Sequence, residues 1–293
     1  AWGYATKEEM EKFGRRYNPC GEMYTDADGN KHYYTDQTDN YLQKNYQLLL
    51  NHSFSTAWNL NVALHYTKGD GYYEEYKPGS SLVEYGLKPF NPDGTETNES
   101  DLVRQKKMDN KFGGGVFSLN YTGNRLTASL GGGLNRYWGN NFGKVTWVKN
   151  YIGNLSPEHE YYRNKSKKTD GNIYLKANYD LTSTLSAYAD LQYRHIDYTI
   201  DGVNDKYDWN KNALRPLAVD KKFDFFNPKV GLNWNITPNH RLYASFSVAQ
   251  KEPTRNNYTD GDPDSYPKAE KLLDYEAGYT FANPWLTAGA NFY

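Results

Sequence analysis

The sequence lacks the features that most quickly assign a chain to a class. Its 293 residues include one cysteine, Cys20, so no disulfide can form within the chain. No apolar run approaches the roughly 20 residues of a transmembrane helix, and the first residues contain no apolar segment of a signal-peptide type. The chain is therefore neither a disulfide scaffold nor a bundle of membrane helices.

An excess of charge of either sign is also missing. With 34 basic and 35 acidic residues, the net charge is −1, which gives no case for a nucleic-acid partner. Two short lysine clusters, at residues 106–111 and 165–168, are expected to be solvated loop charge.

Motifs of catalytic or metal-binding chemistry are absent as well. The six histidines are dispersed without metalloprotease spacing, and no nucleophile elbow occurs. Glycine runs at residues 113–115 and 131–133 are not followed by the Lys-Ser/Thr pair of a phosphate loop. Residues 26–30 form a turn signal without the spaced acidic ligands of a calcium loop. We expect no enzyme activity, no metal site and no resident cofactor.

Aromatic residues are abundant instead. They make up 16% of the sequence, with 29 tyrosines and 7 tryptophans, while the mean hydropathy is −0.94. The aromatic content argues against disorder. The low hydropathy fits strands that are apolar on one face only.

Alternation of apolar and polar residues recurs along the chain. Between residues 241 and 248, for example, Leu242, Ala244, Phe246 and Val248 alternate with polar neighbours and Tyr243. A period of two puts the two sets on opposite faces of a strand. Short turns join pairs of such segments near residues 55–57, 122–124, 181–184, 237–240 and 282–284. The pattern predicts about ten strands in five tight hairpins.

Long polar segments connect each hairpin to the next, at residues 68–106, 139–169, 197–221 and 251–271. Short turns at one end, long loops at the other and aromatic residues bounding the apolar faces are typical of an outer-membrane barrel. A closed sheet also pairs every backbone polar group within lipid. We therefore predict an all-β fold, namely a portion of an antiparallel up-and-down transmembrane β-barrel, with about ten meandering strands, short periplasmic turns and long extracellular loops.

A stretch of about forty residues carries a family resemblance. Residues 245–254 read SFSVAQKEPT, and GDP, PKAEK and DYEAGY follow in that order. This order resembles the motif of TonB-dependent receptors, in which a YaSfs-type strand ends in a k/r-x-P-s/t turn and continues as GNP…L.PE…YE.G. Ala269, between Pro267-Lys268 and Glu270, departs from the motif, as does an extra Asp/Ser/Tyr segment. The Tyr/Asn-rich loops and the NYTDG segment are similar to receptors of Bacteroidetes-type bacteria.

The resemblance implies an outer-membrane receptor that imports a scarce ligand, such as an iron–siderophore complex, haem or cobalamin, and in some members a glycan. Its implied partners are outer-membrane lipid, a small-molecule ligand such as a metal chelate or vitamin, and a TonB-type energy-coupling protein that contacts an N-terminal region. Such receptors close about 22 strands around a plug. We expect residues 1–293 to be part of one transmembrane β-barrel domain. In this interpretation residues 1–39 are an extracellular loop region, and the plug and remaining strands lie outside this chain.

Aromatic and arginine residues of the long loops are the expected ligand contacts, because they offer flat area and ionic recognition. The alternative is that they pack the loops together or lie at the membrane interface. The candidates are Tyr72, Tyr73 and Tyr76 in the first loop, Tyr161, Tyr162 and Arg163 in the second, Trp209 in the third, and Arg255 and Tyr258 in the fourth.

Two other functions stay open at this point. A passive porin or a surface adhesin barrel would share the strand pattern, and a loop constricting the lumen would favour the porin. A soluble glycan-binding β-sandwich would bury the apolar faces of neighbouring hairpins in one core. A single curved sheet with those faces outward would exclude the sandwich.

Overall fold

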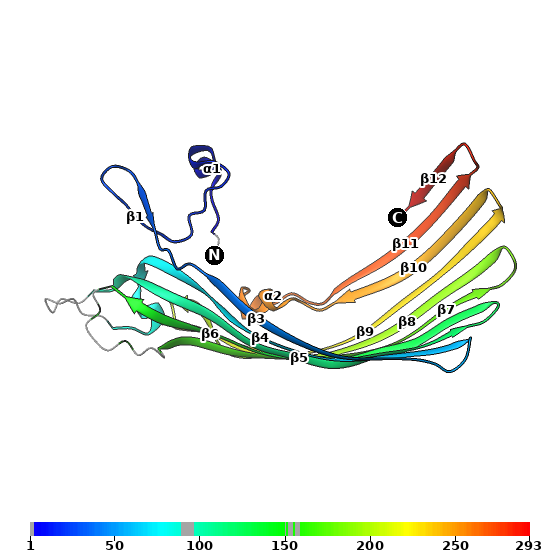
Figure 1. Cartoon of the computed structure of the whole chain (residues 1–293), viewed down its shortest axis with the longest axis horizontal. Helices are drawn as coiled ribbons and strands as arrows, with labels where there is room; N and C mark the ends of the chain where they lie inside the picture. The colour runs from blue at the N-terminus through cyan, green and yellow to red at the C-terminus, as the bar shows by residue number, and fades with distance from the viewer. Residues whose placement is uncertain (1–2, 89–96, 150, 152–154, 156–158) are drawn as a thin grey trace.

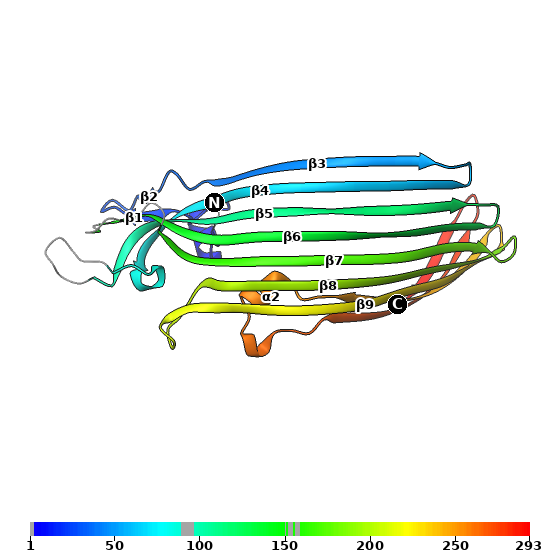
Figure 2. The ribbon, with the colours of Figure 1, turned by 90° about the horizontal axis from the view of Figure 1, so that it is seen from below.

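A ten-stranded antiparallel sheet holds most of the chain in the computed structural model, which describes residues 3–88, 97–149, 151, 155 and 159–293. The strand order is β12-β11-β10-β9-β8-β7-β6-β5-β4-β3, so every hydrogen-bonded neighbour is adjacent in sequence. The sheet is curved into an open trough (Figure 1), and its strands run side by side along the long axis (Figure 2). The predicted all-β meander of ten strands is confirmed.

The strands differ greatly in length, and the longest extend far beyond a membrane span of about 9–11 residues. They are β3 (Asp39–Ser53), β4 (Trp58–Ser81), β5 (Glu99–Thr122), β6 (Leu126–Val148), β7 (Glu160–Asp180), β8 (Leu185–Asp208), β9 (Ala213–Thr237), β10 (His240–Lys251), β11 (Glu270–Ala282) and β12 (Thr287–Phe292).

Three of the predicted long loops are wrong in extent, because most of their residues belong to these strands. Only residues 209–212 separate β8 from β9, where a loop was predicted over residues 197–221. Most residues of 68–106 and 139–169 are likewise strand in the described parts of the chain. Above the membrane the outer face of a strand meets water rather than lipid, so the apolar-outward alternation ends while the backbone pairing continues.

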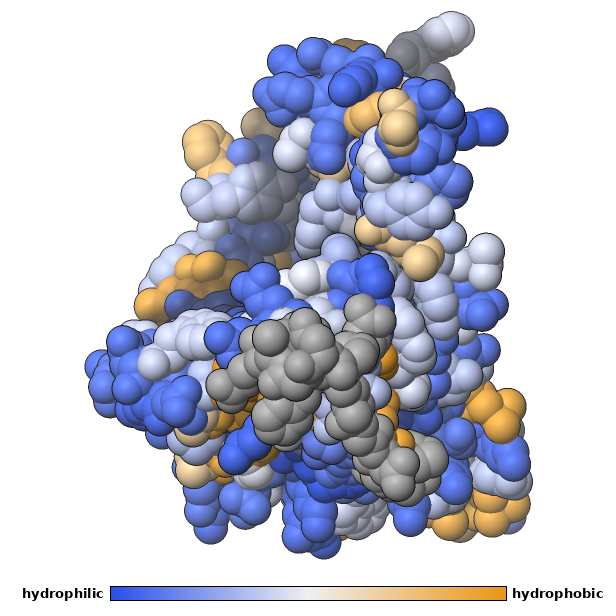
Figure 3. All heavy atoms as spheres, turned by 90° about the vertical axis from the view of Figure 1, so that its left-hand side faces the viewer, coloured by the Kyte–Doolittle hydropathy of each residue, from blue (hydrophilic) through white to orange (hydrophobic). Residues whose placement is uncertain are grey.

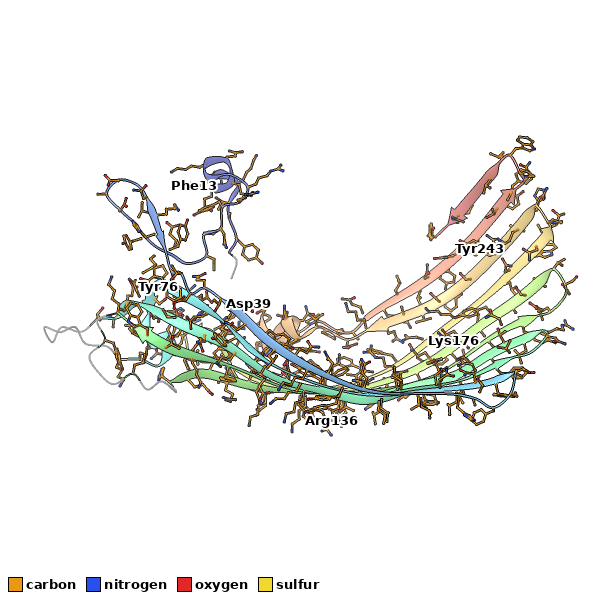
Figure 4. All side chains as sticks on the ribbon, viewed as in Figure 1. Phe13, Asp39, Tyr76, Arg136, Lys176 and Tyr243 are labelled. Carbon is orange, nitrogen blue, oxygen red and sulfur yellow. The ribbon has the colours of Figure 1, made fainter. Side chains whose placement is uncertain are left out.

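The apolar faces point away from the trough. Leu64, Leu134 and Ile173 are 51%, 63% and 51% exposed, and strand alternation places them on the convex side. Figure 4 shows Arg136, from the same face, on the convex side and Lys176, from the opposite face, on the concave side. A single curved sheet with its apolar faces outward excludes the β-sandwich, and it fits a sheet that has lipid outside and a polar lumen inside.

The N-terminal part forms a small separate unit near the end opposite the short turns (Figure 1). It contains α1 (Lys7–Phe13), with a capping box between Thr6 and Glu9, and a hairpin of β1 (Glu22–Thr25) and β2 (Lys31–Tyr33). No helix among the described residues is both long and apolar enough to cross a membrane. The assignment of residues 1–39 to an extracellular loop region stays a prediction.

Two apolar clusters fill the concave side at the end opposite the short turns. The first packs η1 (Leu82–Tyr85) against β5, β6 and β7, and includes Leu102 and Val145. The second packs α2 (Arg255–Thr259) against β8 and β9. Between α2 and β11 lies η2 (Pro263–Ser265). Seen from outside, this end of the molecule is mostly hydrophilic (Figure 3). This end of the trough is therefore packed into apolar clusters, where the sequence predicted polar loops.

Candidate ligand-binding site

A pocket of about 570 Å³ lies beside α2, against the ends of β3–β8 that are far from the short turns. Four of the nine predicted ligand contacts line it: Tyr72 and Tyr73 from β4, Tyr162 from β7 and Arg255 from α2. These four come from three separate segments of the chain, which the meander and the inward fold of residues 252–269 bring together. The volume is within the usual range of small-molecule sites.

The segment 252–269 forms one wall of this pocket because an aromatic anchor holds it on the concave side. Tyr258 is 1% exposed, and its side chain packs in the second cluster with Ile196 and Ile200 of β8 and with Phe225 of β9. Burial of an aromatic side chain of this size contributes a large hydrophobic gain. Figures 1 and 2 show α2 on the concave side of the sheet.

Hydrogen bonds from β8 and β9 to the backbone of the segment fix its position along these strands. Asn204 of β8 donates to the carbonyl of Thr259 at 2.5 Å, and Arg215 of β9 donates to the carbonyl of Gly261 at 3.1 Å. These carbonyls lie at and just beyond the end of α2, where helix carbonyls lack partners in the helix itself. Side chains of β8 and β9 therefore supply the hydrogen-bond donors that these carbonyls lack within the short helix.

An ion-pair network anchors the start of the segment. Glu252, 9% exposed, accepts hydrogen bonds from Lys168 of β7 and from Arg194 of β8, the latter at 3.1 Å. Arg194 also donates to Asp170 of β7 at 2.5 Å. Burial raises the pKa of Glu252, but the hydrogen bond from Lys168 and the nearby positive charges outweigh it, so the pKa lies below its usual value. Lys168 was predicted to be solvated loop charge; it is instead a half-buried member of this network.

The charges that line the pocket are mostly neutralised by neighbours. Lys106 of β5 pairs with Asp205 of β8, and Asp260 pairs with Lys206 at 2.9 Å. Arg255 differs, because its Nη2 donates at 2.6 Å to the neutral amide oxygen of Asn164. That contact orients the guanidinium without cancelling its charge, so the pocket can offer a cation to an anionic group.

Aromatic surface and amides supply the rest of the lining. Tyr72 borders the pocket, but it is in phase with Lys68 on β4, so strand alternation directs its ring to the outer face, where Lys107 lies 4.3 Å from the ring centre; the lumen-facing ring of this strand is that of Tyr73. Tyr162 is 8% exposed, and burial raises the pKa of its hydroxyl, so it stays a neutral hydrogen-bonding group. Asn40, Asn141 and Asp39 complete the polar rim. This combination has the chemistry to match a flat, polar molecule that carries negative charge.

The other five predicted contacts do not line this pocket. Tyr76 is buried and donates to Asp101 at 2.7 Å; Tyr161 is buried in the first cluster, where burial raises the pKa of its hydroxyl. Arg163 pairs with Glu160 and lies over the Phe142 ring at 4.1 Å. Tyr258 anchors α2, and Trp209 stands 61% exposed at the β8–β9 turn. Their contacts match the loop-packing alternative, Trp209 excepted.

Several lining residues were not among the sequence candidates. Lys106, Asn164, Asn204 and Asp205 all belong to the predicted loops, yet they are strand residues that converge across the trough. Lys106 was expected to be solvated, but its ion pair spans from β5 to β8, and the curvature of the sheet brings these strands together. No local motif carries that information, because it depends on the curvature of the meander around the concave side.

Comparison with known families identifies the fold. Residues 4–293 match the model of the TonB-dependent receptor-like β-barrel. The chain belongs to this family. The predicted resemblance is confirmed, and the receptor barrel assigns the convex face to lipid, the concave face to the lumen and the short turns to the periplasm.

Solved receptor structures share the fold at low sequence identity. The chain is similar to the closed form of the ferric-catecholate import receptor Fiu from E. coli K12, with a TM-score of 0.59 and 15% identity over 92% of this chain and 45% of that one. It is also similar to the unliganded ferric citrate transporter FecA, with a TM-score of 0.55 and 13% identity over 94% of this chain and 37% of that one. A third similar structure is the siderophore receptor PiuA from Acinetobacter baumannii, with a TM-score of 0.54 and 14% identity over 87% of this chain and 40% of that one.

The chain spans less than half the length of these three receptors. Such identities show the fold alone, so the ligands in their names are not carried over. A search of curated proteins found no match.

Proposed function

We propose that this chain is the barrel region of an outer-membrane receptor of a Gram-negative bacterium that captures a scarce small molecule in the Arg255 pocket. The observation that carries the proposal is the pocket itself. It combines an orienting cation, tyrosine rings and amides on the lumen side of a barrel of the TonB-dependent family.

The pocket chemistry supports a ligand that is flat, polar and anionic. Arg255 suits a carboxylate or another anionic group, and Tyr73 and Tyr162 offer ring surface. The amide of Asn141 adds hydrogen-bonding capacity to the same wall. Each expected ligand has part of this character: ferric complexes of catecholate or carboxylate siderophores are anionic, haem is a flat ring with two carboxylates, and cobalamin has a flat corrin ring that carries amides. We infer import of one such ligand, with energy supplied by a TonB-type partner acting through a plug domain.

The lumen surface below the pocket supports passage of a polar ligand. On β7 and β8 the concave face carries Lys176, Asp190 and Gln192, and the first two form an ion pair at 3.9 Å. A polar wall presents no apolar surface on which a hydrophilic cargo would lose its hydration.

A passive porin shares one feature with this proposal. The segment 252–269 lies on the lumen side, as a pore-constricting loop would. Family membership favours the receptor, since the matched family is that of TonB-dependent receptors. A porin would leak small solutes without an energy source, whereas the proposed receptor requires one.

The test is an uptake assay in a strain that lacks the receptor gene. Growth on single sources of iron, haem or vitamin identifies the cargo, and collapse of the proton gradient should abolish its uptake. Arg255→Ala should then weaken cargo binding by about 10–100-fold, the equivalent of one charge-assisted hydrogen bond. Trp209→Ala, outside the pocket, is the matched control. Uptake that persists without the gradient, or equal binding by the Arg255→Ala variant, would contradict the proposal.

A further inference from the structure

A row of lysines crosses the outer face of the sheet. Lys44 of β3, Lys68 of β4 and Lys111 of β5 stand directly opposite one another in the strand register. The same row continues to Trp138 of β6 and then to Lys167 of β7. We call Lys44, Lys68, Lys111 and Lys167 the lysine row. Four of the five positions that the row crosses are therefore cationic.

The lysine row faces the lipid side at the upper boundary of the membrane. Its members alternate in phase with the outward-facing Leu64 and Leu134, and all four lysines are exposed. Lys44, Lys68 and Lys111 lie roughly ten residues from the short turns of their hairpins, the length of a membrane-spanning strand. Tyr46 and Tyr66, one step nearer the turns, contribute interfacial aromatic rings. The lysines thus lie at the level of the lipid head groups.

Arg136 adds a fifth cation at this level. It lies on the convex side (Figure 4), and its guanidinium is 5.1 Å from the centre of the Trp138 ring. Trp138 is itself flanked across the strands by Lys111 and Lys167. Cations therefore surround this tryptophan on both neighbouring strands and on its own strand.

Like charges directly opposite in a sheet destabilise it. Within the part of the chain that the structure describes, none of the four lysines of the row takes part in an ion pair. On β4 and β5 the acids of this face are Asp70 and Asp109, one step further from the membrane and opposite each other. Strand β8 adds Asp197 and Asp201, which lie diagonally across from Lys167. On β3–β6 the cations Lys44, Lys68, Lys111 and Arg136 outnumber Asp70 and Asp109, so an external anion would balance this part of the surface.

A hollow of about 400 Å³ opens in this surface. Tyr66, Asp109, Lys111, Trp138 and Asn140 line it. It places the Lys111 ammonium, the Asn140 amide and the Asp109 carboxylate around a concave spot with aromatic walls. Because Asp109 offsets the charge of Lys111, the net positive charge at the hollow comes from Lys68 and Lys167, which flank Lys111 and Trp138 across the strands. Charge and shape therefore coincide at one place, on the face of the barrel opposite to the ligand pocket.

We propose that the lysine row and this hollow bind a phosphate-bearing lipid head group of the outer leaflet of the outer membrane. The phosphates accept hydrogen bonds from the lysine ammonium groups and from Arg136, because these cations match multiple anionic oxygens at short spacing. The acyl chains then run down the apolar face over residues such as Leu64 and Leu134. Charge complementarity and depth select this occupant, and the site is independent of the proposed transport function.

The test uses the full-length receptor, purified in mild detergent and exchanged into nanodiscs. Native mass spectrometry measures retention of a phosphorylated outer-leaflet glycolipid against the same glycolipid with its phosphates removed. The variant is K68Q/K111Q/K167Q, and the control is K7Q/K211Q/K268Q, with equal loss of charge on exposed lysines elsewhere. Each lysine near an anionic membrane surface adds about fivefold in affinity, so the row variant should lose about a hundredfold while the control loses less than about twofold.

Two outcomes would overturn the proposal. One is equal retention of the phosphorylated and dephosphorylated glycolipids by the unmodified receptor, which requires no variant. The other is a row variant that retains the phosphorylated lipid as well as the control does. If the triple variant fails to fold, Lys111→Gln alone should still lose about fivefold, and Lys111→Arg should retain binding. Failure of either single variant to behave so would count equally against the site.

Discussion

The two halves of β8 are patterned in opposite ways. Near the short turn, Leu191 faces outward and is 43% exposed, while Asp190 and Arg194 face the lumen. Further along the same strand, Ile196 and Ile200 face the lumen and are 0% and 1% exposed. Strand β9 shows the same inversion, with Val230 outward and Phe225 and Val219 inward.

The inversion shows that a face is apolar according to what covers it, not according to which side of the barrel it is on. In the lower half lipid covers the outside and water fills the lumen. In the upper half water surrounds the outside, and the segment 252–269 covers the inside. Arg194 lies at the change of pattern, where it holds both Asp170 and Glu252. The ion-pair network therefore marks the upper boundary of the membrane span on the lumen side.

The largest effect is expected from a substitution that uncovers the lumen face of the upper half of β8 and β9. Replacing the buried anchor, Tyr258→Ala, should cost about 3–5 kcal/mol of docking free energy, as for other buried aromatic side chains. That loss should release the segment 252–269 from β8 and β9 while the membrane half stays folded. Hydrogen exchange of the amides of residues 255–269 measures it. Unchanged protection of these amides would show that the backbone hydrogen bonds, not Tyr258, hold the segment.

A charge on the lipid-facing side should destabilise the lower half, which lies in the membrane. Leu175→Arg places a cation near the bilayer midplane and should lower the free energy of unfolding in lipid vesicles by about 2–4 kcal/mol. Gln192→Arg, at a comparable depth on the lumen face of β8, should cost less than about 0.5 kcal/mol. Urea titration in vesicles compares the two. Equal losses would mean that both faces meet the same environment, contrary to the assigned orientation.

The sequence predicted the lower half well and the upper half poorly. Alternation over residues such as Leu185–Tyr193 reports a face that meets lipid along a whole strand, so strand number, turns and orientation followed from it. Above the boundary, Asp197, Gly202 and Asp205 interrupt the pattern, and residues 197–221 were interpreted as a loop. The apolar alternation of Ile196, Tyr198 and Ile200 was available, but it lies in the opposite phase.

The site was predictable only as residue types. Aromatic and arginine side chains near the strand ends included Tyr73, Tyr162 and Arg255, which do line the pocket. Tyr258 had the same local signature but is a buried anchor, because its fate depends on contacts with β8 and β9. The pair of Lys106 and Asp205 is separated by two strands, so only the curvature of the folded sheet brings it together.

Titration of Glu252 should test how much its charge contributes to docking of the segment 252–269 at the boundary between the two halves. Its pKa in the docked state lies below the usual value of 4.5, so its contribution to docking is complete above about pH 5 and is lost as pH falls through the lowered pKa. Glu252→Gln should therefore weaken docking at pH 7 by about 1.5–3 kcal/mol. Protection of residues 255–269 against exchange, followed with pH, should converge for variant and parent in acid. A gap that persists below the lowered pKa would assign the effect to packing instead.

The smallest effect is expected at the β8–β9 turn. Trp209 contacts Tyr207 in a T-shaped pair but is 61% exposed, and it belongs to neither apolar cluster. Trp209→Ala should change the free energy of unfolding by less than about 0.5 kcal/mol. The same urea titration checks this value. A loss comparable to that of Tyr258→Ala would show that the tip packs against a surface outside the described contacts.

The meander also bears on how such a sheet assembles. Because each strand pairs only with its neighbours in sequence, every hairpin can form before the next one is added, and no strand has to be inserted between two existing ones. The growing sheet always ends in a strand whose outer backbone groups are unpaired, and such an edge is costly in hydrocarbon. Assembly in the membrane should therefore proceed as a zipper, with each new hairpin satisfying the edge left by the one before it.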